Sequence, residues 1–185
     1  MFQELLAKRN SAMFNAGMIY FCRELGLTAE EQNLITLQEV SRLEKGTYGT
    51  CGGTYTKDGE LMRVEIKILT NASIIGMLDV LAHELVHARQ HVRNEFTFET
   101  IEHKIFFGLL TVNVKEKFHK GQRLLTTPYY ERHCEIEAHE LAHKLTTGFC
   151  AVVTESAAKA KEVIDESERE LRDTGVTEEG PVLCS

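Results

Sequence analysis

The chain has 185 residues, of which 43% are hydrophobic and 26% are charged, close to the composition of an ordinary globular domain. A formal net charge of −7 and a pI near 5.6 argue against a broad basic surface for nucleic acid or anionic lipid. No run approaches the ~20 apolar residues of a membrane span, and the N-terminal stretch is not a secretory signal. Five cysteines without a C-x-x-C pair exclude zinc ribbons and favour the reduced thiols of a cytoplasm.

The first third of the chain changes its hydrophobic period. Residues 2–25 predict one amphipathic helix, because apolar residues recur there at helical spacing as far as Gly26. The period then falls to two in residues 35–40 and on both sides of Asp58-Gly59, which is a hairpin-turn signal. We therefore expect a half-buried sheet of about three strands, whose last strand places four apolar residues on one face: Met62, Val64, Ile66 and Ile68.

The next predicted helix carries a His-Glu-x-x-His motif and can be capped by Asn71 or Ser73. On an α-helix His83 and His87 lie ~40° apart around the axis and ~6 Å apart along it. Two imidazoles can then share one metal ion. Glu84 is not needed as a ligand, so its carboxylate is free to take a proton from a metal-activated water.

A second copy of the motif supplies His139, Glu140 and His143. Charged residues stand beside it at Glu137 and Lys144, and a buried zinc helix would have to bury them. The neighbours of the first copy are uncharged: Val80, Leu81, Ala82, Leu85, Val86 and Ala88. We therefore assign the metal to the first copy and expect the second copy to lie on a partner helix.

A catalytic zinc site needs a third protein ligand and one open position. His91 stands at +8 from His83, whereas the metzincin pattern needs a histidine at +10, where this chain has Arg93. A glutamate from a second helix is the other common solution, and Glu135 and Glu137 are both available. Residue patterns alone leave these alternatives open.

The strand, "VLAHELVHARQ" and "YYERHCEIEA" together resemble the compact zinc metallopeptidase domains of phage and bacterial genomes, with a general likeness to gluzincins and ImmA/IrrE-type peptidases. The resemblance covers about residues 47–144. It implies one zinc per chain held by His83, His87 and Glu137, the glutamate that directly precedes alanine, with Glu84 as the base. The chain departs from these families at His133 and Cys134, where members often have Pro and an aromatic residue, and in having the second motif.

Residues 96–128 alternate in polarity and predict a β-rich segment that can form a wall of the substrate groove or a simple connection. Catalysis also needs a hydrogen-bond donor to the oxyanion of the transition state. Four side chains could donate such a hydrogen bond: His103, Tyr129, Tyr130 and His133. After Gly148 a heavily charged helix follows. We expect one domain over residues 1–173, with its core motif region at 47–147, and a tail at 174–185.

The predicted fold is α+β and zincin-like: a small antiparallel or mixed sheet packed on the motif helix and on a second ligand-bearing helix, with flanking helices at both ends. The predicted function is zinc-dependent hydrolysis of peptide bonds in a peptide or protein substrate, with no nucleic-acid or membrane partner. The alternative is a metal-containing protein of the same fold that binds or regulates a partner. A DNA-associated protease of the SprT-like kind is disfavoured by the acidic pI and the lack of cysteine pairs.

Overall fold

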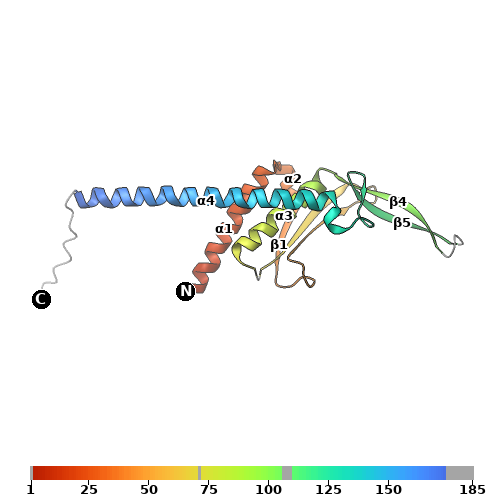
Figure 1. The fold of residues 1–185 in the computed structure, drawn as a ribbon, viewed down its shortest axis with the longest axis horizontal. Coiled ribbons are helices and arrows are strands. Elements are labelled where there is room, and N and C mark those ends of the chain that lie inside the picture. Colours follow the sequence, from red (N-terminus) through yellow and green to blue (C-terminus); the bar gives the residue numbers. More distant parts are fainter. Residues whose placement is uncertain (1, 71, 106–109, 174–185) are drawn as a thin grey trace. The chain divides into compact units, whose positions relative to one another are not determined.

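The structure is a computed structural model that describes residues 2–70, 72–105 and 110–173 (Figure 1). The chain divides into two compact units, Met1–Thr147 and Gly148–Ser185. The sequence predicted one domain up to residue 173, and the boundary falls inside that range. The predicted tail, 174–185, lies outside the described residues. Among the described helices, none has the length and apolar character that crossing a membrane requires.

The first unit begins with two helices. Helix α1 (Phe2–Glu24) buries Phe14 and Phe21, and two residues after its end Gly26 has a positive φ of 64°. Left-handed backbone of this kind suits glycine, which has no Cβ to clash. Helix α2 (Ala29–Asn33) starts with a capping box, in which Thr28 and Glu31 exchange side-chain to backbone hydrogen bonds.

A mixed sheet follows, with strands β1 (Ile35–Val40), β2 (Gly49–Tyr55) and β3 (Leu61–Leu69) in the order β1-β3-β2. Strand β3 pairs parallel with β1 and antiparallel with β2. Gly59, at φ 92°, lies in the β2–β3 turn and confirms the predicted hairpin. Val64, Ile66 and Ile68 are fully buried, whereas Met62, predicted on the same face, is exposed.

Helix α3 (Ile74–Val92) carries the first motif and packs against β3, β2 and α1. The hydroxyl of Ser73 accepts a hydrogen bond from the Gly76 amide at 3.2 Å and caps the helix. The other candidate cap, Asn71, lies outside the described residues. Helix α3 contributes more buried apolar residues to this unit than any other element in the described part of the chain: Leu78, Leu81, Ala82, Leu85, Val86 and Ala88.

A second, antiparallel sheet confirms that residues 96–128 are rich in β-structure. It contains β4 (Phe96–Ile105), β5 (Leu110–His119) and the short β6 (Gln122–Arg123), in the order β4-β5-β6. A 3-10 turn (Tyr129–Glu131) leads into helix α4 (His133–Asp173), which begins in the first unit and continues through the second. The α+β class is therefore confirmed, with one mixed and one antiparallel sheet.

Candidate metal centre

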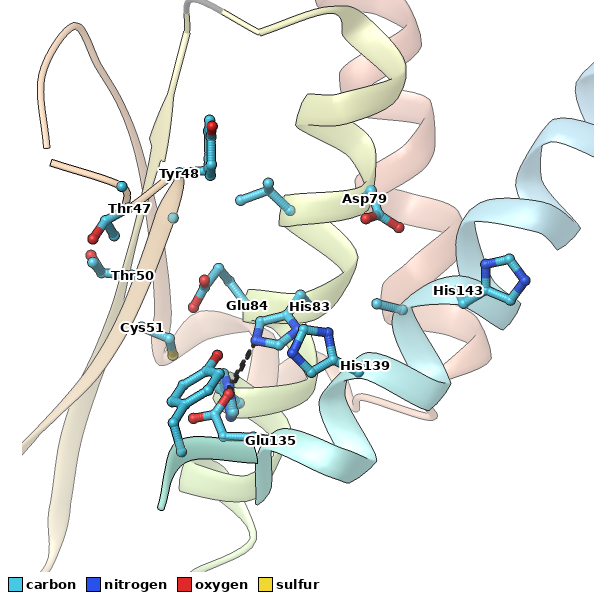
Figure 2. A pocket seen from close by; sticks show the side chains of 16 residues that line it. Thr47, Tyr48, Thr50, Cys51, Asp79, His83, Glu84, Glu135, His139 and His143 are labelled. Carbon is cyan, nitrogen blue, oxygen red and sulfur yellow. Dashed lines mark hydrogen bonds and ion pairs between the residues drawn. The ribbon is translucent and has the colours of Figure 1, made fainter. Parts of the chain in front are cut away.

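Helices α3 and α4 bring three ligand atoms to one place. His83 Nε2 lies 3.1 Å from His87 Nε2, and Glu135 Oε2 lies 3.2 Å from His87 Nε2 and 3.4 Å from His83 Nε2. Figure 2 shows Glu135 of α4 beside His83 of α3. Metal–ligand bonds of about 2.0–2.1 Å in a tetrahedral site, as in zinc proteins, give ligand atoms about 3.3 Å apart. The three atoms therefore have the mutual spacing of ligands that share one ion.

The charges of these groups also suit a cation. Burial acts to raise the pKa of Glu135, but hydrogen bonds from His83 and His87 outweigh it and hold that pKa well below its usual range. Burial acts to lower the pKa of His87, but the hydrogen bond with Glu135 and its charge overcome this and raise the pKa. The carboxylate of Glu135 is thus ionised beside two imidazoles at neutral pH.

A buried glutamine orients one of the two imidazoles. Gln90 is fully buried, and its amide nitrogen donates to Cys134 O at 3.3 Å and to Glu137 Oε2 at 3.0 Å. Its amide oxygen therefore faces His87 Nδ1, 2.9 Å away, and accepts the proton there. With Nδ1 protonated, the Nε2 lone pair of neutral His87 is left for a metal, as in other metal sites whose histidines are held by a second hydrogen bond.

The sequence-based choice of Glu137 as third ligand is corrected by this geometry. Glu137 pairs with Arg89, accepts a hydrogen bond from Gln90 and lies 3.3 Å from Lys120 Nζ. It is about 200° around α4 from Glu135, so one helix cannot turn both carboxylates toward the same histidines. Glu135, which the sequence left as the alternative, occupies the place beside them.

His91, the other alternative ligand, has different partners. Its side chain is only 2% exposed, with Nδ1 2.5 Å from the Tyr55 hydroxyl and Nε2 3.4 Å from Lys117 Nζ. Burial first, and then the positive charges of Lys117 and His87, lower the pKa of His91 to about 3. His91 is therefore a neutral residue of the core, and it does not join His83.

Glu84 is 7% exposed and its carboxylate projects between α3 and β2 (Figure 2). Burial raises its pKa, the charges of His87 and His83 lower it, and that of Glu135 raises it further, so that the net pKa is raised. A carboxylate with a raised pKa that is not needed as a ligand has the properties of a general base. Glu84 lines the same cavity as His83 and His87, and its role as a base stays a prediction.

Two glycines of β2 allow the strand to approach this part of α3. A Cβ at Gly49 would lie 2.8 Å from Glu84 Oε1, and one at Gly53 would lie 2.6 Å from His91 Nδ1. A Cβ at Gly52, on the other side of the strand, would meet nothing within 4 Å. Larger residues at the two inward positions would push the helix or its side chains away from the strand.

A cavity of about 780 Å³ opens beside the ligand atoms, between β2, α3 and the start of α4. His139 and His143 of the second motif line it, together with Tyr129. The His139 ring lies 4.6 Å from that of His83, and His83, Glu135 and His139 offer ligand atoms within 4.8 Å of one another. The second motif therefore lies on a partner helix, as predicted, but His139 is closer to the centre than its exposed sequence context suggested.

The four predicted oxyanion donors have different positions. Tyr129 lines the cavity and hydrogen-bonds to Glu135, and burial followed by that interaction raises its pKa, so that it stays a neutral donor. Tyr130 is 82% exposed, and His133 lines a different surface pocket. The side chain of His103 lies outside the described part of the structure.

A second group of ligand-type residues, Glu95, His119 and Glu137, also gathers within 4.8 Å. Here Lys120 Nζ lies 2.9 Å from Glu95 Oε2 and 3.3 Å from Glu137 Oε2. Lys120 bridges both carboxylates and Arg89 also pairs with Glu137, so two cations balance them and this cluster is an ion-pair network of the fold.

Comparison of the chain with protein-family models, curated proteins and solved structures gives no match. The chemistry of the donors is informative by itself, since two histidines and one glutamate form a ligand set of catalytic zinc sites. His83, His87 and Glu135, with His139 close by, therefore form a group within the described part of the chain that could hold a metal ion.

Proposed function

We propose that this protein is a zinc-dependent peptidase with a zincin-like site. The observation that carries the proposal is the convergence of His83, His87 and Glu135 beside the buried carboxylate of Glu84, at the wall of a large cavity. Three protein ligands leave the fourth position of a tetrahedral site open, which is the arrangement of catalytic zinc. A purely structural site would have no use for a second carboxyl group, that of Glu84, in this position.

Zinc at this place would supply Lewis acidity toward a water molecule and toward the carbonyl group of the scissile bond. His83, His87 and Glu135 would hold the ion, and Gln90 keeps His87 in the tautomer that can bind it. Glu84 takes the proton of the attacking water on its carboxylate and passes it to the leaving amine. Its raised pKa favours both steps, because the protonated form is easier to reach than in water.

The proposed substrate is a peptide because of the strand beside the site. Strand β2 stands at the edge of its sheet, and within the described residues its one partner is β3. Gly49, Thr50 and Cys51 of this strand line the cavity. An extended peptide can pair with such an edge through its backbone, which aligns a peptide bond with the neighbouring helix.

A second candidate function is suggested by His139. Its ligand atom lies within 4.8 Å of those of His83 and Glu135, so a modest side-chain movement would make it a fourth protein ligand. Four protein ligands close a zinc site and are typical of structural zinc. The protein would then be a metal-containing binding or regulatory protein of the same fold.

Substitution of Glu84 by glutamine separates these functions. The Glu84→Gln protein should keep one zinc per chain and lose about two to four orders of magnitude in peptide cleavage, because size is preserved and the base is removed. The matched control is Glu140→Gln, which makes the same change at the exposed glutamate of the second motif and should cleave like wild type.

Activity is first sought with a peptide library, with a chelator-treated sample alongside. Equal cleavage by wild type and Glu84→Gln would refute the proposed mechanism. Stoichiometric zinc in a wild-type protein that cleaves no peptide, with zinc affinity strongly reduced in His139→Ala, would favour the closed site.

A further inference from the structure

A second cavity, of about 460 Å³, adjoins the candidate metal centre on the side of the β4–β5 hairpin. It shares Cys51, His87 and Glu135 with the larger cavity, so a ligand can reach from one into the other along the metal site. We call it the Lys117 pocket. Its remaining walls combine apolar side chains with cations: His91, Phe96, Val114, Lys115, Glu116, Lys117, Leu124, Leu125, Arg132 and Cys134.

The charges of the Lys117 pocket oppose the net charge of the chain. Lys115, Lys117 and Arg132 line it, whereas the formal net charge of the whole protein is −7. The buried carboxylate of Glu116 forms a salt bridge with Arg123, so that its charge is balanced. The ionised carboxylate of Glu135 also lines the pocket, so that three cations face one carboxylate that is not balanced by Arg123. The net charge of the lining is therefore positive, and it attracts an anionic part of a ligand.

Lys117 interacts electrostatically with two residues of the shared wall, Cys51 and Glu135. Its Nζ lies 3.4 Å from His91 Nε2 and 3.6 Å from the centre of the Phe96 ring. Among the described residues it has no carboxylate within ion-pair distance. Burial lowers its pKa, although the groups of Cys51, Cys134 and Glu135 act to raise it. A partly buried ammonium held by an imidazole and a ring is stabilised when an anion arrives.

We propose that the Lys117 pocket binds a carboxylate of the substrate, supplied by an acidic side chain or by a C-terminus, next to the bond that is cleaved. The proposal rests on the proposed function, because the pocket is defined by its shared wall with the metal centre. The ammonium of Lys117 binds the carboxylate, and Phe96, Leu124 and Leu125 contact the methylene groups that carry it.

Binding of three small probes tests this without requiring cleavage. N-acetyl-glutamate amide carries a side-chain carboxylate, N-acetyl-glutamine carries a terminal one, and N-acetyl-glutamine amide is neutral. In nuclear magnetic resonance titrations of the full chain, with and without zinc, at least one carboxylate probe should bind about ten- to hundredfold more tightly than the neutral probe. The tighter of the two identifies the source of the carboxylate.

Substitutions assign the preference to a residue. It should disappear in Lys117→Met and persist in Lys67→Met, which removes an equal charge from strand β3, outside the pocket. Lys117→Arg, which keeps the charge, should retain it. Circular dichroism shows whether each variant folds. In wild type, the carboxylate probes should shift the amide resonances of Cys51 and Lys117, so that the test does not depend on one variant.

The outcomes separate this inference from the peptidase proposal. If the carboxylate probes still bind more tightly in Lys117→Met, Lys117 is not the group that binds them and the inference is overturned. If the preference appears only when zinc is present and does not depend on Lys117, the carboxylate binds the metal, and the inference is overturned as well. Equal binding of all three probes, or resonance shifts confined to other regions, would also overturn it, even if wild type cleaves peptides. A preference that depends on Lys117 in a protein that cleaves nothing would support the pocket while the peptidase proposal fails.

Discussion

Protonation of His91 should destabilise the folded protein as the pH falls. Its pKa is about 3 when folded, because of burial and of the charges of Lys117 and His87, against an ordinary value of 6.5. The unfolded chain therefore binds the proton more readily, and the stabilising contribution is complete above about pH 6.5 and is lost as the pH falls toward 3. At about 1.36 kcal/mol per pH unit, the loss is about 2 kcal/mol at pH 5 and at most roughly 5 kcal/mol.

Urea unfolding of metal-free protein at several pH values measures this effect. Circular dichroism is the suitable signal, since the chain has no tryptophan. His91→Gln removes the titrating ring, so the free energy of unfolding should fall less steeply between pH 7 and pH 5 than in wild type, by about 2 kcal/mol. Tyr55→Phe removes the hydroxyl partner but keeps the ring, and it should retain the wild-type slope. Equal slopes for wild type and His91→Gln would refute the reasoning.

Three further predictions follow from the centre and its supporting strand. Glu135→Ala should abolish stoichiometric zinc binding, whereas Glu137→Ala should still bind one zinc with affinity reduced by about tenfold, the usual effect of losing an outer hydrogen bond. Dialysis followed by metal analysis distinguishes the two variants. Loss of zinc from Glu137→Ala and retention by Glu135→Ala would restore Glu137 as the ligand. Gly49→Ala should lower the free energy of unfolding by about 1–3 kcal/mol through overpacking, while Gly52→Ala, with open space around it, should change it little in the same urea experiment. Added zinc should raise the Tm of wild type but not of His83→Ala in thermal melts, because the ion stabilises only a protein that binds it; an equal rise in both would argue against the assigned site.

Local sequence signals predicted the elements that carry the first motif. The Asp58-Gly59 turn fixed the β2–β3 hairpin, and the uncharged residues around His83 and His87 matched the buried face of α3. The parallel pairing of β1 with β3 was not predicted. It joins segments that no short turn connects, so it depends on long-range packing that periodicity does not encode.

The choice between Glu135 and Glu137 shows the same limit at the site. Cys134, Ala138 and Ala142 form the buried stripe of α4, and the two glutamates flank that stripe on opposite sides. Only the rotation of α4 against α3 decides which one meets the histidines. The resemblance to known peptidases implied Glu137. His139 was a sequence signal that favoured Glu135, because it follows Glu135 by one turn on the same side of the helix. In the structure the His139 ring lies close to that of His83.

Anomalous X-ray diffraction at the zinc edge, from crystals of the zinc-loaded protein, tests the central claim most directly. One peak should lie about 2.0–2.1 Å from Nε2 of His83, Nε2 of His87 and a carboxylate oxygen of Glu135, with no fourth bond from the protein. A peak bound by Glu137, or one completed by His139 as a fourth protein ligand, would contradict the open catalytic site.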